Sequence, residues 1–476
     1  MSMPLNINIR LRLNNQPGTL ARVLMIVAKK KGSLGAIELI SATQSYITRD
    51  LMIRLRDRSH LGEIIEALDA IHDVEIIHVA DRVVMKHLGG KIEVSSKIPI
   101  QNWEDLALVY TPGVAGVSEA IAQDPDMVYK LTMKGNSVAI VTDGSAILGL
   151  GNLGPAAALP VMEGKAVLFK RFANINAFPL CLDAHEPDQI IEAVAAIAPS
   201  FGGINLEDIS APKCFEIEEK LSKRLDIPVF HDDQHGTAIV TLAGLLNALK
   251  VINKNIQDIK MVISGAGAAG VAIARLLKKS GVKHLIVCDR KGAIARDNMP
   301  AVNSKMWIAE NTNEECRHGS LKEVLIGADV FVGVSAPRLL NRDDVLKMSE
   351  RPVVFALANP DPEVEPEELF DIAGVIATGR SDYPNQINNA LAFPGLFRGA
   401  LNCHARTIND EMCLAAAHAL AGIINDEQLA ADNIIPSIFN DIVAPTVAKA
   451  VEKAAERTGV SRHILNGKEE EFDSLL

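Results

Sequence analysis

Residues 260–270 read KMVISGAGAAG and decide the fold of the second half of the chain. The apolar run before the glycines predicts a buried strand, and the run VAIARLLKK after them predicts a helix. The glycines themselves fulfil the pattern GxGxxG. A second apolar run, HLIVCD, ends in Asp289, 19 residues beyond Gly270. This series of strand, glycine turn, helix and acidic strand end is typical of a dinucleotide-binding unit.

The residues of the glycine turn have separate mechanical roles in such a unit. The first glycine allows the tight turn, the second lets backbone N–H groups approach the pyrophosphate, and the third permits close packing of helix and strand. We therefore predict a cofactor-binding turn that consists of Gly265, Gly267, Ala268, Ala269 and Gly270.

Asp289 bears on which dinucleotide binds. Its carboxylate would accept hydrogen bonds from the ribose hydroxyls of the adenosine end and would repel a 2′-phosphate, which favours NAD. Arg290 and Lys291 follow it directly, and either cation can pair with a phosphate. The sequence therefore predicts NAD as the cofactor, with NADP as the alternative.

Short apolar runs continue on both sides of this unit. Downstream they have the spacing of a doubly wound, Rossmann-type α/β sheet: GADVFVGVS, PVVFALANP and GVIATG. From about residue 98 to residue 230 helical patterns alternate with buried-type strands, which predicts a second parallel α/β layer: NSVAIVTD, FPLCLD, GGINLEDI and IPVFHDD. The chain after residue 398 is rich in alanine and predicted to be mostly helical.

The first 85 residues follow a different pattern. Residues 5–13 alternate with period two, and helical runs at 20–30 and 60–71 are interleaved with further apolar runs, which gives the βαββαβ order of a ferredoxin-like domain. The stretch 87–97 contains Gly and Ser and predicts a hinge. We expect an N-terminal domain of residues 1–85, a substrate domain of residues 88–231 completed by residues 390–476, and a cofactor domain of residues 232–389.

Composition excludes several classes of protein. The 476 residues carry a net charge of −11 and only 4% aromatic residues, so we expect no nucleic-acid partner. No stretch approaches the ~18 consecutive apolar residues of a membrane span, and the N-terminus lacks the pattern of a secretion signal. None of the six cysteines forms a CxxC pair, which is typical of reduced thiols in a cytoplasmic protein.

Acidic residues follow two of the predicted strands. Glu207 and Asp208 come after GGINL, and Asp232 and Asp233 come after IPVFH. Because the carboxyl ends of parallel strands open into one crevice, we expect these carboxylates to converge. Converging carboxylates repel one another unless a cation lies among them, and hard oxygen ligands suit Mg²⁺ or Mn²⁺.

Two other interpretations of the second acidic pair are open. His231 and His235 have the i, i+4 spacing of a zinc site, although the first histidine follows a strand-like run and the glutamate of HExxH is missing. Alternatively, the acids are solvated, and Asp233 caps a helix that begins near Gly236.

Two further residues stand in unusual surroundings. Tyr110 lies at the turn YTPGVA before a helix, and Lys165 lies in EGKAVLF, a helical run that is otherwise largely apolar. Taken singly, each has an ordinary explanation, because tyrosine packs with its polar tip outward and lysine extends its amine to water.

Taken in order, these motifs resemble those of the malic enzymes. The resemblance runs from about residue 100 to residue 460 and rests on YTPGVA, TDGSAILGLGNLGP, EGKAVLF, INLEDI, FHDDQHGTA, GAGAAG, LANPDPE and NQINNALAFPG. The chain length and the form HDDQHGTA resemble the shorter bacterial branch. At the front, the PGTLARV turn resembles the ACT family of small regulatory domains, which implies pairing of two copies and, as an alternative to pairing alone, binding of a small-molecule effector.

The resemblance implies a reaction. Malic enzymes convert L-malate to pyruvate and CO₂, with reduction of NAD(P)⁺ and a divalent metal. The implied roles are metal ligation by Glu207, Asp208 and Asp233, general base by Lys165 with the support of Asp232, general acid by Tyr110, and substrate binding by Asn359 and Asn389, of which Asn359 also belongs to the cofactor site.

The base must be a neutral amine, because it takes the C2 hydroxyl proton of malate as hydride leaves C2. Free lysine has a pKa of about 10.4, and we expect burial and a nearby metal cation to lower it. One motif departs from the family, since larger members carry a substrate-binding arginine in the loop where this chain has Ala146. Asn389 and Arg380 are candidates for that contact.

Three rival functions differ in what they require. A malolactic enzyme shares this site but keeps its NAD bound and releases lactate. An amino-acid dehydrogenase also combines a buried lysine with a dinucleotide domain but needs no metal. A non-catalytic metabolite sensor would depend on the front domain alone. Independently of the function, we expect this protein to form a homodimer or a larger assembly, because its front domain resembles one that pairs.

Overall fold

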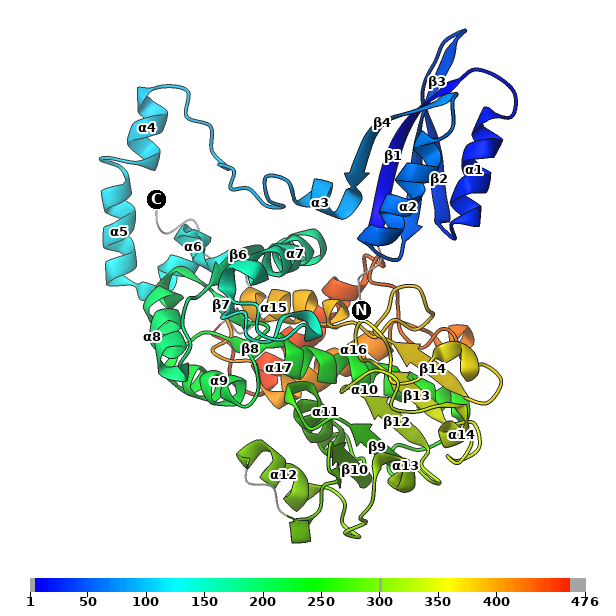
Figure 1. Ribbon diagram of the computed structural model, residues 1–476. Coiled ribbons are helices and arrows are strands. Elements are labelled where there is room, and N and C mark those ends of the chain that lie inside the picture. The colour runs from blue at the N-terminus through cyan, green and yellow to red at the C-terminus, as the bar shows by residue number, and fades with distance from the viewer. Residues whose placement is uncertain (1–4, 299–301, 463–476) are drawn as a thin grey trace. The chain divides into compact units, whose positions relative to one another are not determined.

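Period-two alternation along strand β1 (Leu5–Asn14) gives it one apolar face, which is buried under helices α1 (Thr19–Lys29) and α2 (Arg58–Asp69). β1 lies inside an antiparallel sheet of order β2-β3-β1-β4, formed with β2 (Ser33–Ala42), β3 (Tyr46–Leu55) and β4 (Val74–Asp81). A short helix, α3 (Arg82–His87), follows. This βαββαβ order confirms the predicted ferredoxin-like domain (Figure 1).

The computed structural model describes residues 5–298 and 302–462. It divides the chain into two units, residues 1–94 and residues 95–476. The second unit contains both of the predicted α/β sheets.

The first sheet of the second unit is parallel and has the order β6-β5-β7-β8. Its strands are β5 (Ser137–Thr142), β6 (Asn176–Cys181), β7 (Gly203–Leu206) and β8 (Val229–His231). The helices that precede or connect them are α4 (Trp103–Val109), α5 (Val114–Gln123), α6 (Val128–Leu131), α7 (Pro155–Ala173), α8 (Pro187–Ile197) and α9 (Lys213–Arg224).

The second sheet has the order β11-β10-β9-β12-β13-β14, parallel except for β11. The chain order of its parallel strands is 2-1-3-4-5, a doubly wound arrangement whose switch point lies between β9 and β12. Its strands are β9 (Lys260–Ser264), β10 (His284–Asp289), β11 (Gly292–Ala293), β12 (Val330–Gly333), β13 (Val353–Ala356) and β14 (Val375–Thr378). This topology confirms the predicted Rossmann-type sheet.

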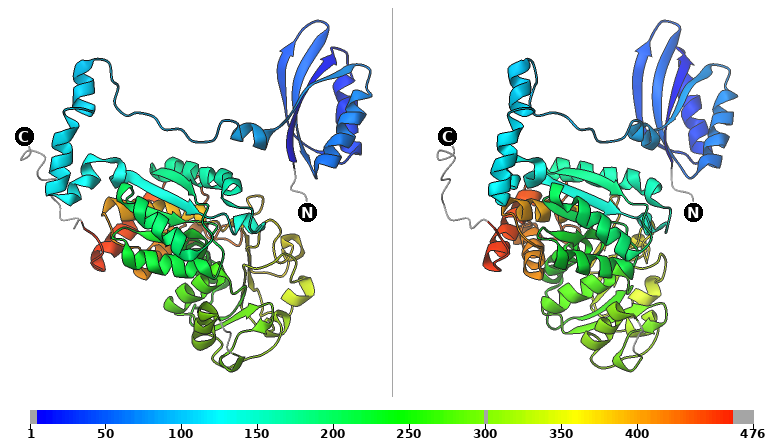
Figure 2. Two further views of the ribbon diagram at one scale, coloured as in Figure 1. Left: turned by 60° about the vertical axis from the view of Figure 1, so that its left-hand side comes forward. Right: turned by 90° about the vertical axis from the view of Figure 1, so that its left-hand side faces the viewer.

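The remaining helices pack on this sheet or on other helices of the unit (Figure 2). They are α10 (Asp232–Ile252), α11 (Ala268–Lys279), α12 (Asn303–Asn311), α13 (Leu321–Val324), α14 (Arg342–Val345), α15 (Phe393–Asn402), α16 (Asp410–Ala421) and α17 (Val443–Arg457). Short 3₁₀ turns lie at Pro125–Met127, Met133–Asn136, Ile147–Gly149, Ala198–Ser200, Arg296–Asn298, Pro366–Glu368, Asn389–Leu391 and Asp426–Gln428.

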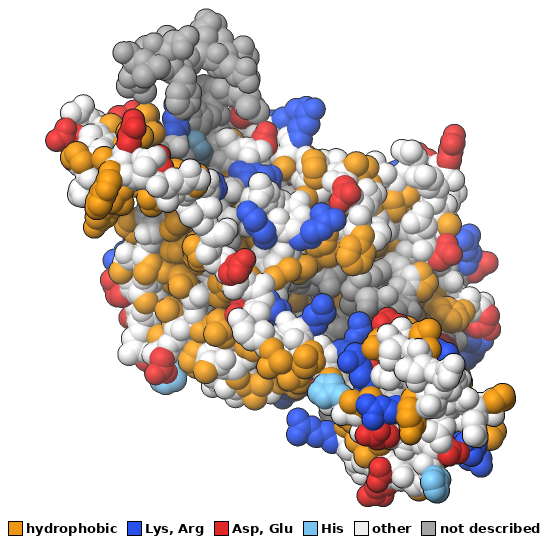
Figure 3. Space-filling view, turned by 90° about the horizontal axis from the view of Figure 1, so that it is seen from above, with side chains coloured by type: hydrophobic (Ala, Val, Ile, Leu, Met, Phe, Trp, Pro, Cys, Tyr) orange, Lys and Arg blue, Asp and Glu red, His pale blue; other side chains and the backbone are white. Residues whose placement is uncertain are grey.

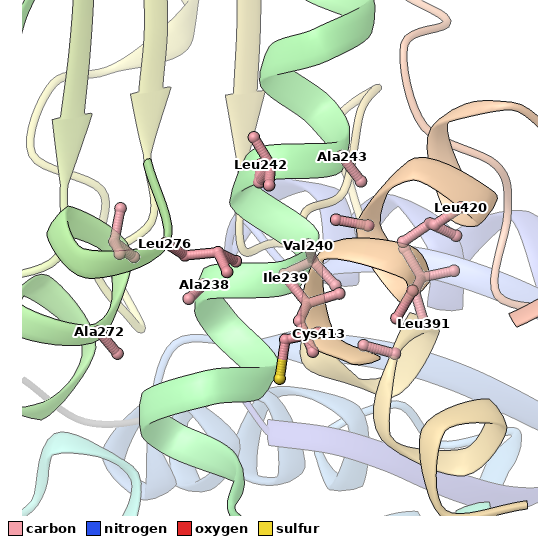
Figure 4. Close-up of a cluster of buried hydrophobic side chains, with 14 of the residues drawn as sticks. Ala238, Ile239, Val240, Leu242, Ala243, Ala272, Leu276, Leu391, Cys413 and Leu420 are labelled. Carbon is pink, nitrogen blue, oxygen red and sulfur yellow. The ribbon is translucent and has the colours of Figure 1, made fainter. Parts of the chain in front are cut away.

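Helix α10 joins the two sheets and lies at the centre of the core. Figure 4 shows its side chains Ile239, Val240 and Leu242 among residues of α11 and α16. Within the described residues α10 is long and apolar enough to cross a bilayer, yet 72% of its apolar window is buried inside the protein. One continuous cluster of buried residues contacts strands of both sheets, so the division of this unit at residues 231 and 390 stays a prediction.

Asn247 on α10 offers a test of this packing. Its buried side chain donates hydrogen bonds to the backbone carbonyls of Ala421 (2.9 Å) and Ile434 (3.0 Å). Asn247→Ala leaves both carbonyls without this donor, and we expect the free energy of unfolding to fall by about 2 kcal/mol or more. Thermal unfolding of the full chain measures the change. The exposed Asn255→Ala is the control, and equal melting temperatures for the two variants would contradict the prediction.

Candidate active site

Acidic residues lie at the carboxyl ends of β5, β7 and β8, among them those singled out in the sequence. Asp143 follows β5, Glu207 and Asp208 follow β7, and Asp232 follows β8 directly. Because these strands are parallel neighbours, their ends meet at one edge of the sheet. Helix α7 brings Lys165 to the same edge.

Lys165 is buried in contact with two carboxylates. Its Nζ donates to Glu207 Oε2 at 2.6 Å and forms a second ion pair with Asp232, and it lies 4.3 Å from the centre of the Phe393 ring. Only 7% of the residue is exposed. Burial by itself lowers the pKa of Lys165, but Asp232 and Glu207 outweigh this effect and raise the pKa above its usual range. Burial thus acts in the expected direction, and the lowering expected from a metal cation stays a prediction.

The acidic groups are also perturbed by burial. Burial raises the pKa of Asp232 to about 6 against the opposing effect of Lys165, and it raises the pKa of Glu207 and Asp233 as well. Glu207 accepts a hydrogen bond from Asn205 Nδ2 at 2.9 Å. Three carboxyl groups thus lie close to one ammonium group, and buried negative charge in excess is favourable only when a cation or protons offset it.

The chemistry of this donor set fits a hard divalent cation, because all the side-chain donors are carboxylate oxygens. Two of these carboxylates, however, are turned to donors of the protein: Asp233 accepts the backbone N–H of Asp208 at 2.9 Å, and Glu207 accepts from Lys165 Nζ. Over residues 5–298 and 302–462, no three His, Cys, Asp or Glu side chains converge as ligands of one metal ion.

The observed geometry differs from what the two other interpretations of the second acidic pair require. Helix α10 begins at Asp232, so Asp233 lies in its first turn and does not cap a helix near Gly236. His231 ends strand β8, whereas the His235 ring faces Glu218 on α9 at 3.0 Å. The two histidines therefore do not lie on one face of one helix, as the zinc interpretation requires.

The glycine turn borders a large cavity. The cavity has a volume of about 880 Å³ and is lined by residues that include Gly265, Gly267, Asp289 and Lys305. Gly265 has a φ of 120°, and a Cβ there would lie 2.7 Å from the backbone oxygen of Val334. A Cβ on Gly270 would lie 1.8 Å from the Gly265 oxygen. Helix α11 begins at Ala268 and Ala269, so its N-terminus is at the cavity.

The Asp289 carboxylate already has two partners within the protein. Its carboxylate accepts the backbone N–H of Lys291 at 2.8 Å and forms an ion pair with Lys305 of α12 at 2.6 Å. Although burial opposes it, the Lys305 hydrogen bond holds the pKa of Asp289 below its usual range. Sequence reasoning missed Lys305, because nothing in the run around it distinguishes it from a solvated lysine.

The remaining predicted residues divide into those inside and those outside the cluster. Asn389 donates to the Asp232 carboxylate. Asn359 follows β13 and is exposed. Arg380 is held by Asp382 in an ion pair. The contacts described for Asn359 and Arg380 include none with Lys165 or with the acidic residues that surround it.

Tyr110 lies outside the cluster. It follows α4 directly as the C-cap, and 65% of its surface is exposed. Figures 1 and 2 show α4 and α5 projecting from the sheets. This segment exposes apolar side chains, among them Trp103, Leu108 and Val117. Figure 3 shows hydrophobic side chains at its left-hand edge, where α4 and α5 lie.

Sequence reasoning also missed residues that contact the cluster or hold the loops that carry it. Phe393 lies under the Lys165 amine and Asn205 binds Glu207. Asp143 pairs with Lys213, and the Ala146 N–H donates to the Asp208 carbonyl at 2.9 Å, which fixes the loop after β5 against the acidic loop after β7. Both asparagine and phenylalanine stand inside quoted motifs, but only the fold shows what they contact.

Comparison with known proteins identifies the family. The family described as "Malic enzyme, N-terminal domain" matches residues 89–222, "Malic enzyme, NAD binding domain" matches residues 234–456, and "ACT domain" matches residues 2–78. The NAD-dependent malic enzyme of Geobacillus stearothermophilus is 53% identical over 96% of both chains.

Other relatives agree with this. The bifunctional malic/malolactic enzyme of Bacillus subtilis is 55% identical over 78% of this chain and 92% of its own length. Proteins named NADP-dependent malic enzymes also match. The crystal structure of the NAD-dependent malic enzyme of Thermotoga maritima superposes with a TM-score of 0.76 at 47% identity, covering 78% of this chain and 99% of that one. The chain therefore belongs to the malic enzyme family, as an oxidoreductase with an NAD-binding domain and an N-terminal ACT domain.

Proposed function

We propose that this protein oxidises L-malate with NAD⁺ and a divalent metal ion and releases pyruvate and CO₂. The observation that carries the proposal is the buried contact of Lys165 with Glu207 and Asp232. The cofactor cavity is also lined by Ala211 and Pro212, which closely follow Asp208 in the chain. The lysine–carboxylate cluster and the cavity are thus joined by one short loop, as transfer of hydride from malate to a nicotinamide requires.

In this proposal Lys165 Nζ takes the C2 hydroxyl proton of malate. Asp232 and Glu207 hold the amine in place, and Asn389 and Asn359 bind the substrate carboxylate. Glu207, Asp208 and Asp233 would hold Mg²⁺ or Mn²⁺. Such an ion, when bound, supplies positive charge that offsets the carboxylates, favours the neutral amine and polarises the C2 oxygen of malate.

The decisive experiment is a steady-state assay of the full chain with malate, NAD⁺ and Mn²⁺. We expect NADH and pyruvate, loss of activity with EDTA, and recovery with excess Mn²⁺. Lys165→Ala should lower kcat by roughly 10³-fold or more, because general bases contribute about 10²–10⁴-fold, while NADH binding is kept. Lys170→Ala, an exposed lysine of the same helix, is the control. Activity that survives EDTA would favour a metal-independent amino-acid dehydrogenase instead.

A second candidate function is favoured by one observation, the identity shared with a bifunctional malic/malolactic enzyme. The same assay distinguishes the two, because a malolactic enzyme releases lactate and no free NADH. Formation of lactate in place of pyruvate and NADH would contradict our first proposal and support the malolactic function.

Tyr110 as general acid needs a second subunit in this proposal. Its phenol is exposed on an apolar segment of α4 and α5, and a homodimer that buries this segment would bring the tyrosine to the partner's Lys165. A neighbouring lysine ammonium can then return the proton that the phenol gives to C3 of enolpyruvate.

Mixed dimers test this arrangement. Tyr110→Phe and Lys165→Ala should each be inactive in oxidative decarboxylation as homodimers. A purified dimer with one variant on each chain should regain about half of the parent activity, because one of its two sites then has both groups. Tyr110→Phe should still reduce oxaloacetate. Mixed dimers as inactive as the two homodimers would show that both groups come from one subunit.

We propose that NAD is preferred and that NADP is also accepted. Asp289 disfavours a 2′-phosphate, but Lys305 neutralises it, and Arg290 and Lys291 also line the cavity. Lys305→Gln should raise the KM for NADP by about tenfold or more, since a charged contact of ~1.4 kcal/mol corresponds to tenfold in binding, and should change the KM for NAD less than twofold. Lys283→Gln, exposed before β10, is the control. An unchanged ratio of the two KM values would contradict the assignment.

We also propose the cellular compartment of the enzyme and the kind of effector that its ACT domain binds. All six cysteines are unpaired, which suits the cytoplasm. The ACT domain suggests an amino acid or a similar metabolite as effector, bound where two copies pair.

A further inference from the structure

One buried carboxylate outside the cluster holds the segment that carries Asp232 and Asp233. Glu218 lies on α9, and its side chain is only 14% exposed. Its Oε1 accepts the backbone N–H of His231 at 2.9 Å. Its Oε2 accepts from Gln234 Nε2 at 3.0 Å and faces the His235 ring nitrogen Nε2 at 3.0 Å.

These contacts lie on both sides of the two aspartates. His231 precedes them and Gln234 follows them, so Glu218 fixes the chain at either end of the pair. Helix α10 has His231 as its N-cap, and the His231 side chain makes no capping hydrogen bond. A helix N-terminus normally needs a side-chain acceptor for its free N–H groups. Glu218 supplies an acceptor there from a neighbouring helix.

The consequence is that the aspartates are not used as caps. Asp232 turns to Lys165 and Asn389, and Asp233 turns to the backbone N–H of Asp208. Phe230 packs against the His235 ring at 5.5 Å between centroids, which holds the far end of the clamp in place. Each element of the clamp therefore orients the first turn of α10 toward the cluster.

We propose that Glu218 is a positioning residue that sets the direction of Asp232 and Asp233 for metal and lysine. This inference rests on the proposed function. Glu218 touches neither substrate nor cofactor and acts through the turn that it clamps. Glu218→Gln is the sharpest change, because the amide has the same shape but only one acceptor oxygen. Turned one way, its NH₂ group meets the backbone N–H donor of residue 231. Turned the other way, it replaces the acceptor shared by Gln234 and His235, so that both side chains must change their orientation or tautomer to bind it.

Mn²⁺ binding to the full chain, followed by electron paramagnetic resonance without substrate, measures the effect. We expect the Kd for Mn²⁺ to rise by about tenfold or more in Glu218→Gln, the scale found for partners of metal ligands, with the Kd for NADH within twofold of the parent. Glu219→Gln is the matched control, since Glu219 is the next residue of α9 and pairs with Lys223 at the surface. It should bind Mn²⁺ as the parent does.

Each outcome decides the matter. Equal Mn²⁺ affinity in Glu218→Gln and the parent overturns the inference and leaves the proposed function intact. A parent that binds no Mn²⁺ and has no malate activity overturns both. If Glu218→Gln fails to fold, His235→Ala removes a single bond of the clamp. Mn²⁺ binding weakened threefold or more in that variant, with NADH binding kept, supports the inference, and unchanged Mn²⁺ binding overturns it.

Discussion

The buried ion pairs of Lys165 are the constraint on which the rest of the site depends. An ammonium group removed from water is tolerated only beside well-placed carboxylates, and here Asp232 and Glu207 provide them. Lys165 comes from α7, Glu207 from the end of β7 and Asp232 from the start of α10. In the sequence, Lys165 is 42 residues from Glu207 and 67 residues from Asp232. Any movement of one element would leave a buried charge without its partner.

The parallel sheets make this arrangement possible. In both sheets of the second unit the strand ends that carry chemistry lie at the carboxyl edge, where residues can be polar without interrupting the core. Helix α10 starts with the acidic pair at the small sheet and continues as the apolar centre of the core. The same helix thus anchors the chemistry and the stability of the unit, and Glu218 connects its first turn to α9.

Charge neutralisation recurs at the cofactor cavity. The sequence position of Asp289 predicts a preference for NAD, yet Lys305 offsets its charge in the folded chain. A carboxylate with a cationic partner repels a phosphate less than a free one does, so in our proposal the pair, and not the aspartate alone, sets the preference between NAD and NADP. In our proposal Tyr110 is a parallel case, because its role as general acid requires a second subunit to cover α4 and α5.

The sequence by itself was sufficient for the ferredoxin-like domain, the Rossmann-type sheet, the glycine turn and the gathering of acids, because these follow from local periodicity and from the rule that parallel strand ends converge. The malic enzyme resemblance added the roles. Only the tertiary structure decided the raised pKa of Lys165, the Asp289–Lys305 pair, the clamp by Glu218 and the exposure of Tyr110. Each of these depends on distances between residues or on burial, and neither quantity is encoded in the spacing of a motif.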